Sequence, residues 1–139
     1  MTDTTFDVAA RAWVEAWKTG WAGHDPDVIA ARYAEDCLIR TQPFRPVERG
    51  RESIRAFAER AFAEERSARF VFGEPLVGQD GRATVEYRAV IAATAGGDVT
   101  LHGVSVLRFA PDGLVAEHRD CWTEHEGDRG TDLVQEASR

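Results

Sequence analysis

The chain has 139 residues, and its 17 basic and 24 acidic side chains give a net charge of −7. This acidic balance argues against nucleic acid or an anionic membrane as the main partner, because both attract basic surfaces. Hydrophobic residues make up 43% of the chain, enough to bury the core of one domain of ordinary size without disulfides. We therefore expect a single domain, with its core over residues 6–123 and a polar tail over residues 124–139.

Cys37 and Cys121 show no metal-binding spacing, and we expect reduced thiols and no metal site. The N-terminal segment lacks a basic region followed by an apolar run, so no secretory signal is predicted. No stretch reaches the roughly 18 apolar residues that a membrane-spanning helix needs. These features predict a cytoplasmic protein, and nothing in the sequence calls for a cofactor.

Helical patterns occupy the first half of the chain. Apolar residues at spacings of three and four predict a helix over residues 6–22, with Trp13, Trp17 and Trp21 on one face. Asp25, as N-cap, and the proline after it predict a short second helix that ends near Asp36. A short strand over residues 37–41 and a proline-rich connection follow. The same periodicity then predicts a third helix over residues 51–65. The charged cluster of Glu64, Glu65 and Arg66 at its end is interpreted as a solvated face.

In the second half of the chain, apolar and polar residues alternate with a period of two, which is typical of strands. Four strands are predicted, over residues 69–77, 82–94, 99–109 and 114–123, and short glycine-containing turns join them. Such connections make neighbouring strands antiparallel. Helices followed by a strand meander indicate an α+β fold, with the helices packed on one face of the sheet.

The last strand carries the most informative alternation. It places His118, Asp120 and Trp122 on one face, and Glu117 and Arg119 on the other. Turning the second set inward would bury two charges and no large apolar group, which is costly. We therefore expect Asp120 to face the helices.

Four segments resemble one known family: residues 13–17 (WVEAW), 27–36 (DVIAARYAED), 50–57 (GRESIRAF) and 118–122 (HRDCW). They are similar to the SnoaL-like group of the nuclear transport factor 2-like superfamily, which includes polyketide cyclases, ketosteroid isomerases and limonene epoxide hydrolases. The resemblance implies a cone-shaped α+β barrel, in which three N-terminal helices pack on a curved, mainly antiparallel sheet around a pocket. It also implies a homodimer through the outer sheet face, to which we assign Leu101, Leu107, Phe109 and Val115.

The resemblance also implies roles for single residues. Asp120 matches the general acid/base of the cyclases, and His102 is the candidate for their pocket histidine. Tyr33 or Tyr87 is the candidate for stabilising an oxyanion, as a tyrosine does in the steroid isomerases. The substrate-binding candidates are Trp17, Trp21, Phe57, Tyr87, His118 and Trp122. Epoxide hydrolases need a second carboxylate two residues after an inner-strand arginine, but Val90 holds that position after Arg88, which makes epoxide hydrolysis the less favoured activity.

Two functions remain open at this point. One is a cofactor-independent isomerase, cyclase or hydratase-like lyase, in which Asp120 moves a proton beside the carbonyl group of an apolar substrate. The other is a non-catalytic ligand-binding or dimerisation module of the same fold. An enzyme needs at least two polar groups that converge in the pocket, whereas a binding protein can manage with one.

Overall fold

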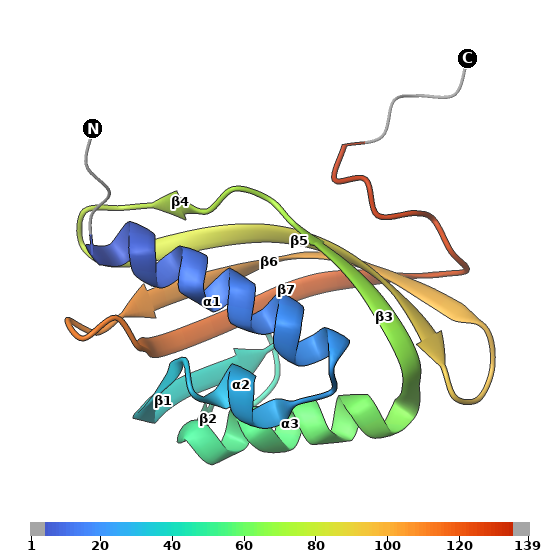
Figure 1. The fold of residues 1–139 in the computed structure, drawn as a ribbon, viewed down its shortest axis with the longest axis horizontal. Coiled ribbons are helices and arrows are strands. Elements are labelled where there is room, and N and C mark those ends of the chain that lie inside the picture. The colour runs from blue at the N-terminus through green and yellow to red at the C-terminus, as the bar shows by residue number, and fades with distance from the viewer. Residues whose placement is uncertain (1–4, 135–139) are drawn as a thin grey trace.

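The computed structural model describes residues 5–134. Within them lie the helices α1 (Thr5–Ala22), α2 (Pro26–Ala30) and α3 (Arg51–Glu64). A seven-stranded sheet is formed by β1 (Tyr33–Thr41), β2 (Glu48–Arg49), β3 (Glu65–Phe72), β4 (Leu76–Val77), β5 (Arg82–Ala93), β6 (Asp98–Phe109) and β7 (Val115–Glu126). The strand order is β2-β1-β7-β6-β5-β3, with β4 paired to β5 (Figure 1). All pairs are antiparallel except β1 and β7, which are parallel.

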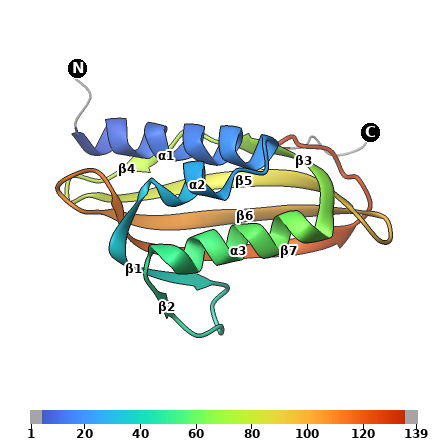
Figure 2. The same ribbon diagram turned by 60° about the horizontal axis from the view of Figure 1, so that its bottom comes forward.

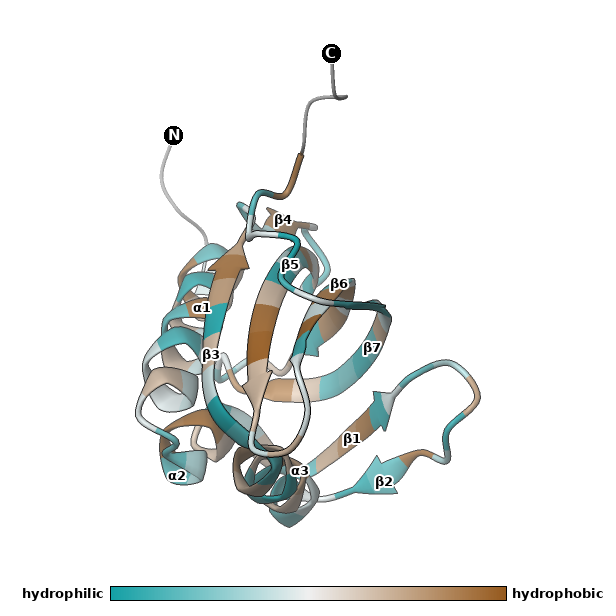
Figure 3. Ribbon diagram, turned by 90° about the vertical axis from the view of Figure 1, so that its right-hand side faces the viewer, coloured by the Kyte–Doolittle hydropathy of each residue, from teal (hydrophilic) through white to brown (hydrophobic). Residues whose placement is uncertain are grey.

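The sheet curls around the helices on its concave side. α1 runs across the sheet, and α3 packs against α2, β1 and β3 (Figure 2). Seen from the end, the strands bend from β3 round to β1 and β2, with the helices inside the curve (Figure 3). The predicted α+β class is confirmed, but the sheet is open, because β2 and β3 end it without pairing with each other.

The second helix is shorter than predicted. It ends at Ala30, and β1 begins at Tyr33, whereas the sequence suggested a strand from residue 37. The reason is long-range pairing: Tyr33 pairs with Val115 of β7, and its side chain is completely buried. Local periodicity carries no information about a partner strand that lies about 80 residues away in the sequence.

The core forms between the tryptophan face of α1 and the inner face of the sheet. Trp13, Trp17 and Trp21 are all buried, at 1%, 6% and 5% exposure. Ile29 of α2 and Ile54 of α3 complete the helical side of the same cluster. No helix in the described part of the chain is both long and apolar enough to span a membrane.

The side chains that we assigned to the outer sheet face lie inside the fold instead. Leu107, Phe109 and Val115 are buried at 1%, 4% and 0% exposure, and Leu101 lines an interior cavity. An irregularity in register after Arg108 lets Phe109 and Val115 pair and both face the core. The assignment was therefore wrong, and the homodimer, which loses this support, stays a prediction.

The segment after β7 crosses the outer face of its own sheet. Thr100 Oγ1 donates a hydrogen bond to the Gly127 carbonyl over 2.7 Å, and Arg88 donates to the carbonyls of Arg129 and Gly130. Arg69 and Asp128 form an ion pair at 2.8 Å. The tail was predicted to begin at residue 124, but β7 continues to Glu126, and residues 127–133 then contact β6, β5 and β3. Residues 135–139 of that tail lie outside the described residues.

Candidate active site

A cavity of about 340 Å³ lies between the helices and the inner face of the sheet, within the size range of small-molecule sites. Aromatic side chains from both layers line it: Trp13, Trp17, Trp21, Phe57, Phe70, Phe72, Tyr87 and Trp122. Its carboxylates are Asp120 on β7, Glu64 and Glu65 at the junction of α3 and β3, and Glu124 at the end of β7. This wall suits an apolar ligand with a small number of polar groups.

Asp120 is the centre of a polar network on β7. Its Oδ1 accepts hydrogen bonds from the Tyr87 hydroxyl, over 2.9 Å, and from the Cys121 backbone N–H, over 3.0 Å. Its Oδ2 lies 3.2 Å from Ser105 Oγ and 3.0 Å from His118 Nε2. An ionised carboxylate is purely an acceptor, so these four donors suit an ionised Asp120. The side chain is 12% exposed and borders the cavity.

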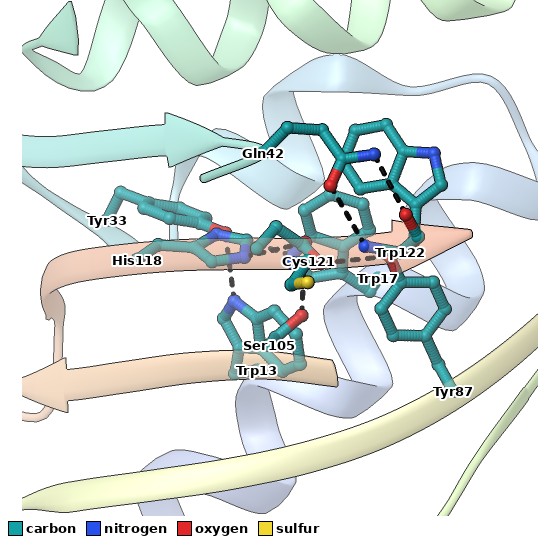
Figure 4. A network of polar contacts seen from close by, with 10 residues as sticks. Trp13, Trp17, Tyr33, Gln42, Tyr87, Ser105, His118, Cys121 and Trp122 are labelled. Carbon is teal, nitrogen blue, oxygen red and sulfur yellow. Dashed lines mark hydrogen bonds and ion pairs between the residues drawn. The ribbon is translucent and has the colours of Figure 1, made fainter. Parts of the chain in front are cut away.

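A chain of hydrogen bonds behind Asp120 determines the tautomer of His118 (Figure 4). The indole N–H groups of Trp13 and Trp17 both point at the Tyr33 hydroxyl oxygen, at 3.0 and 3.2 Å. Indoles only donate, so Tyr33 accepts twice and gives its own proton to His118 Nδ1, 2.8 Å away. The proton of a neutral His118 is then on Nε2, from which it is donated to Asp120.

Both tyrosines of this network are held in the protonated form. Burial raises the pKa of Tyr33 well above its ordinary value of 10.0. Burial, together with the negative charge of Asp120, does the same to the pKa of Tyr87. Each phenol therefore remains a hydrogen-bond donor throughout the neutral pH range. Tyr87, which also borders the cavity, can offer its proton to a bound molecule.

Three of the predicted site residues do not line the cavity. Tyr33 and His118 are 0% and 2% exposed; Tyr33 is hydrogen-bonded to His118, and His118 to Asp120. His102 lies on the opposite face of the sheet, where Nε2 is 2.8 Å from Glu86 Oε2. Its cross-strand partner is Arg88, and directly paired residues share a face. Because Tyr87 points inward, Arg88 and His102 point outward, and the prediction that His102 accompanies Asp120 was wrong.

Asp120 and the remaining predicted residues do line the cavity, the latter being Trp17, Trp21, Phe57, Tyr87 and Trp122. Their role in binding a substrate stays a prediction. Sequence reasoning missed Ser105, which alternates along β6 with Leu101 and Leu107, two residues that we assigned to the outer face. The signal that would have found it is the cross-strand pairing, because Ser105 lies directly opposite Asp120, which was expected to face the helices.

Glu65 was predicted to lie on a solvated helix face, but it is buried at 5% exposure. α3 ends at Glu64, so Glu65 begins β3 and points into the fold. Its Oε1 accepts a hydrogen bond from the Trp21 indole over 2.9 Å. Its Oε2 has no hydrogen-bond partner and lies 3.5 Å from His24 Nε2. Burial raises the pKa of the Glu65 carboxyl above its ordinary value of 4.5, an effect that Trp21 and His24 only partly offset.

Replacing Glu65 with glutamine is expected to stabilise the protein at neutral pH by about 1 kcal/mol, because a buried carboxylate that lacks a full set of partners is costly. The raised pKa means that the folded state binds this proton more tightly than the unfolded state. The stability that the protonated carboxyl contributes is therefore lost as pH rises from about 4.5 through the higher folded value. Thermal unfolding of both proteins between pH 4 and pH 8 measures the effect.

Glu59→Gln is the matched control for this experiment, since Glu59 is exposed on α3 and the same charge is removed. We expect the two melting temperatures of wild type and Glu65→Gln to converge toward pH 4 and to separate above it. A Glu65→Gln protein that is less stable than wild type at pH 7 would show instead that the ionised carboxylate is a net stabilising group.

The chain has the nuclear transport factor 2-like fold, an open α+β cone with helices inside a curved sheet. The chain belongs to the SnoaL-like domain family, whose sequence model matches residues 10–118. No protein with a curated function matches the sequence significantly. Among residues 5–134, no group of three or more histidine, cysteine, aspartate or glutamate side chains is arranged to hold a metal ion.

Three solved structures illustrate the likeness in fold. SalBIII, an epoxide hydrolase/cyclase-like enzyme of pyran ring formation in the polyether salinomycin, has a TM-score of 0.70 at 20% identity, over 84% of this chain and 91% of that one. A Catenulispora acidiphila protein with a ketosteroid isomerase-like fold, in complex with trimethylamine, has a TM-score of 0.67 at 19% identity, over 77% of this chain and 82% of that one. An LEH-like epoxide hydrolase of M. tuberculosis has a TM-score of 0.66 at 17% identity, over 83% of this chain and 82% of that one.

Proposed function

We propose that this protein is an isomerase- or cyclase-like enzyme that uses Asp120 as a general acid/base on an apolar, carbonyl-bearing substrate. The observation that carries the proposal is the position of Asp120, whose carboxylate borders an aromatic cavity and is held by four donors. Two of those donors, Tyr87 and Ser105, border the cavity themselves. At least two polar groups therefore converge at one point, as an enzyme requires.

The proposed chemistry begins with proton removal. Asp120 takes a proton from a carbon beside the carbonyl group, so that a C–H bond breaks, an O–H bond forms on the carboxylate, and the electron pair moves to the carbonyl oxygen. The Tyr87 hydroxyl, released from the neutralised carboxyl, donates to the resulting oxyanion. Asp120 then returns its proton to another carbon in an isomerisation. In a cyclisation, the enolate carbon attacks a second electrophilic carbon of the same molecule, and the proton goes to the new oxyanion.

His118 acts in this proposal as a positioning residue. Its Nε2–H holds Oδ2 of Asp120, while Tyr33 and the two indoles behind it keep the imidazole in one tautomer. The carboxylate is thus held at the cavity wall before any substrate binds, which lowers the reorganisation that the reaction needs.

The solved structures include both activities: one is named an epoxide hydrolase/cyclase-like enzyme, one has a ketosteroid isomerase-like fold, and one is an epoxide hydrolase. The preference for an isomerase or cyclase over a hydrolase rests on the residues of this chain. Arg88, which the epoxide hydrolase pattern would need inside the pocket, instead contacts Arg129 and Gly130 on the outer face. The second candidate function is a ligand-binding module of the same fold, which the aromatic wall alone would also suit.

The test is to identify what the cavity retains and whether the protein exchanges carbon-bound protons. Protein purified from its own host is analysed by native mass spectrometry, and a panel of cyclic ketones is incubated with it in D₂O and followed by NMR. We expect a retained carbonyl compound and deuterium incorporation beside the carbonyl group above the buffer rate. A retained ligand without a carbonyl group, together with no exchange for any ketone, would instead favour the binding module.

A further inference from the structure

The end of β7 beyond Asp120 is held by a side chain, that of Gln42, and not by a neighbouring strand on this side. The parallel ladder between β1 and β7 ends at the pair Thr41 and Asp120. Two residues further along β7, Gln42 Nε2 donates to the Trp122 carbonyl over 2.9 Å, and Gln42 Oε1 accepts the Trp122 backbone N–H over 3.1 Å (Figure 4). The side-chain amide, which offers a donor and an acceptor, thus takes the place of a peptide unit in the ladder.

The backbone of Gln42 is strained. Its φ of 139° lies in a region that favours glycine. The chain turns away from β7 directly afterwards, in a turn closed by the Arg45 N–H on the Gln42 carbonyl over 3.1 Å. Pro43, the next residue, has no N–H with which to extend the ladder. Glycine at position 42 would adopt this backbone without strain but would lose the amide that binds Trp122. The strained residue is therefore the one that supplies the amide.

Trp122 is the cavity residue whose position depends on this pair of hydrogen bonds. The other seven aromatic side chains that line the cavity each contact a further aromatic ring, whereas the Trp122 ring contacts none among the described residues. Its cross-strand neighbour on β6 is Gly103, which has no side chain to pack against it. Its indole N–H reaches the exposed Glu124 over 3.3 Å. The backbone of Trp122 therefore sets where this part of the cavity wall lies.

We propose that Gln42 is a positioning residue, which holds Trp122 as one wall of the cavity and so sets the affinity of the site for flat apolar ligands. Gln42 is not among the lining residues in the described part of the chain, so it acts through Trp122. Asp120 is held by four other donors, none of which belongs to Gln42. The inference rests on the proposed function only in placing the substrate in this cavity. It gives Gln42 a part in binding and none in the proton transfer.

The experiment is a double-mutant cycle on ligand binding, with 2-tetralone as the probe. This cyclic ketone has a flat ring and exchangeable C–H bonds beside its carbonyl group. In Gln42→Glu the side chain keeps its shape, but an oxygen replaces the amide nitrogen and repels the Trp122 carbonyl. Calorimetric titration of the full chain at pH 7 is expected to give a Kd about three- to tenfold higher than that of wild type. In a Trp122→Ala background, the same substitution is expected to change Kd less than about twofold, because the wall on which Gln42 acts is absent.

Gln42→Gly is the second variant, since it removes both hydrogen bonds and also relieves the positive φ. It is expected to raise Kd to a similar extent, while its melting temperature stays within about 5 °C of wild type because the two changes offset each other. Hydrogen exchange of the Trp122 amide, followed by NMR, is expected to be at least about tenfold faster in this variant. Gln79→Glu is the matched control: it makes the same charge change in the exposed turn before β5, and we expect an unchanged Kd.

Each outcome decides the proposal. An unchanged Kd in both Gln42 variants, or an equal loss of affinity in the wild-type and Trp122→Ala backgrounds, would overturn it. Wild-type protein that does not bind 2-tetralone would overturn it as well, because a wall held for flat apolar ligands must retain this one.

The deuterium-exchange assay decides the proposed function separately. At saturating 2-tetralone, the exchange rate in Gln42→Glu is expected to stay within about twofold of wild type, because the substitution weakens binding and leaves the base in place. Exchange that falls at saturation as much as affinity does would show that Gln42 positions Asp120 instead, and would overturn the role in binding. Binding without exchange in wild type would remove the proposed proton chemistry and leave the role of Gln42 intact.

Discussion

Replacing Asp120 with asparagine is expected to lower the rate of ketone deuterium exchange by about 10²- to 10⁴-fold, the usual contribution of a general acid or base. Asparagine keeps the shape of the side chain but cannot take a proton from carbon. The measurement is the NMR exchange rate for a ketone that wild-type protein turns over. Because Asp120 borders the cavity and no other described carboxylate lies within this network, no neighbour can replace it.

The same substitution is expected to reduce stability. The amide has one acceptor oxygen for four donors, so if that oxygen keeps the Tyr87 and Cys121 bonds, its NH₂ group faces the proton on His118 Nε2. A mismatch of this kind costs about 1–3 kcal/mol, so the exchange rate is measured below the melting temperature of the variant. Glu117→Gln is the control: Glu117 lies on the same strand but pairs with Arg108. An Asp120→Asn protein that exchanges as fast as this control would exclude Asp120 as the base.

Gly103→Ala is expected to cause the largest loss of stability, about 3 kcal/mol or more, because added atoms would overlap backbone that cannot move independently. Gly103 pairs with Trp122 across β6 and β7. A Cβ atom at Gly103 would lie 2.6 Å from Trp122 Cβ and 2.9 Å from Trp122 Cα, and would also overlap the Cys121 carbonyl oxygen. The two strands approach so closely only because Gly103 has no side chain. Chemical denaturation monitored by circular dichroism measures the loss.

Gly97→Ala is the matched control for this substitution. Gly97 lies in the β5–β6 connection, and a Cβ atom there would meet nothing within 4 Å. We expect its unfolding free energy to stay within about 0.5 kcal/mol of wild type. If Gly103→Ala unfolded at the same denaturant concentration as Gly97→Ala, the close approach of β7 to β6 would not be needed for this fold. If Gly103→Ala folds but is destabilised, its exchange rate is also expected to fall, since Asp120 is two residues from Trp122 on β7.

Local periodicity determined much of the fold. The three-and-four spacing of apolar residues, the tryptophans among them, predicted α1, and Asp25-Pro26 predicted the start of α2. Alternation in β7 placed Asp120 inward, as the structure has it. These features depend on neighbours within a few residues along the chain, which is the range over which side-chain periodicity carries information.

The tertiary structure alone decided which face of β6 points inward. The orientation of the β6 side chains follows from the pairing of this strand with β5 and β7. This pairing places Ser105 at the cavity and His102 on the opposite face of the sheet. The tertiary structure also decided that Tyr33, far from His118 in sequence, sets the tautomer of that ring. Glu65 became a cavity residue because α3 ends one residue before it. The positions of these residues depend on which strands pair and on where a helix ends. Strand pairing and helix ends are determined by packing between distant segments, and not by the local pattern of apolar residues.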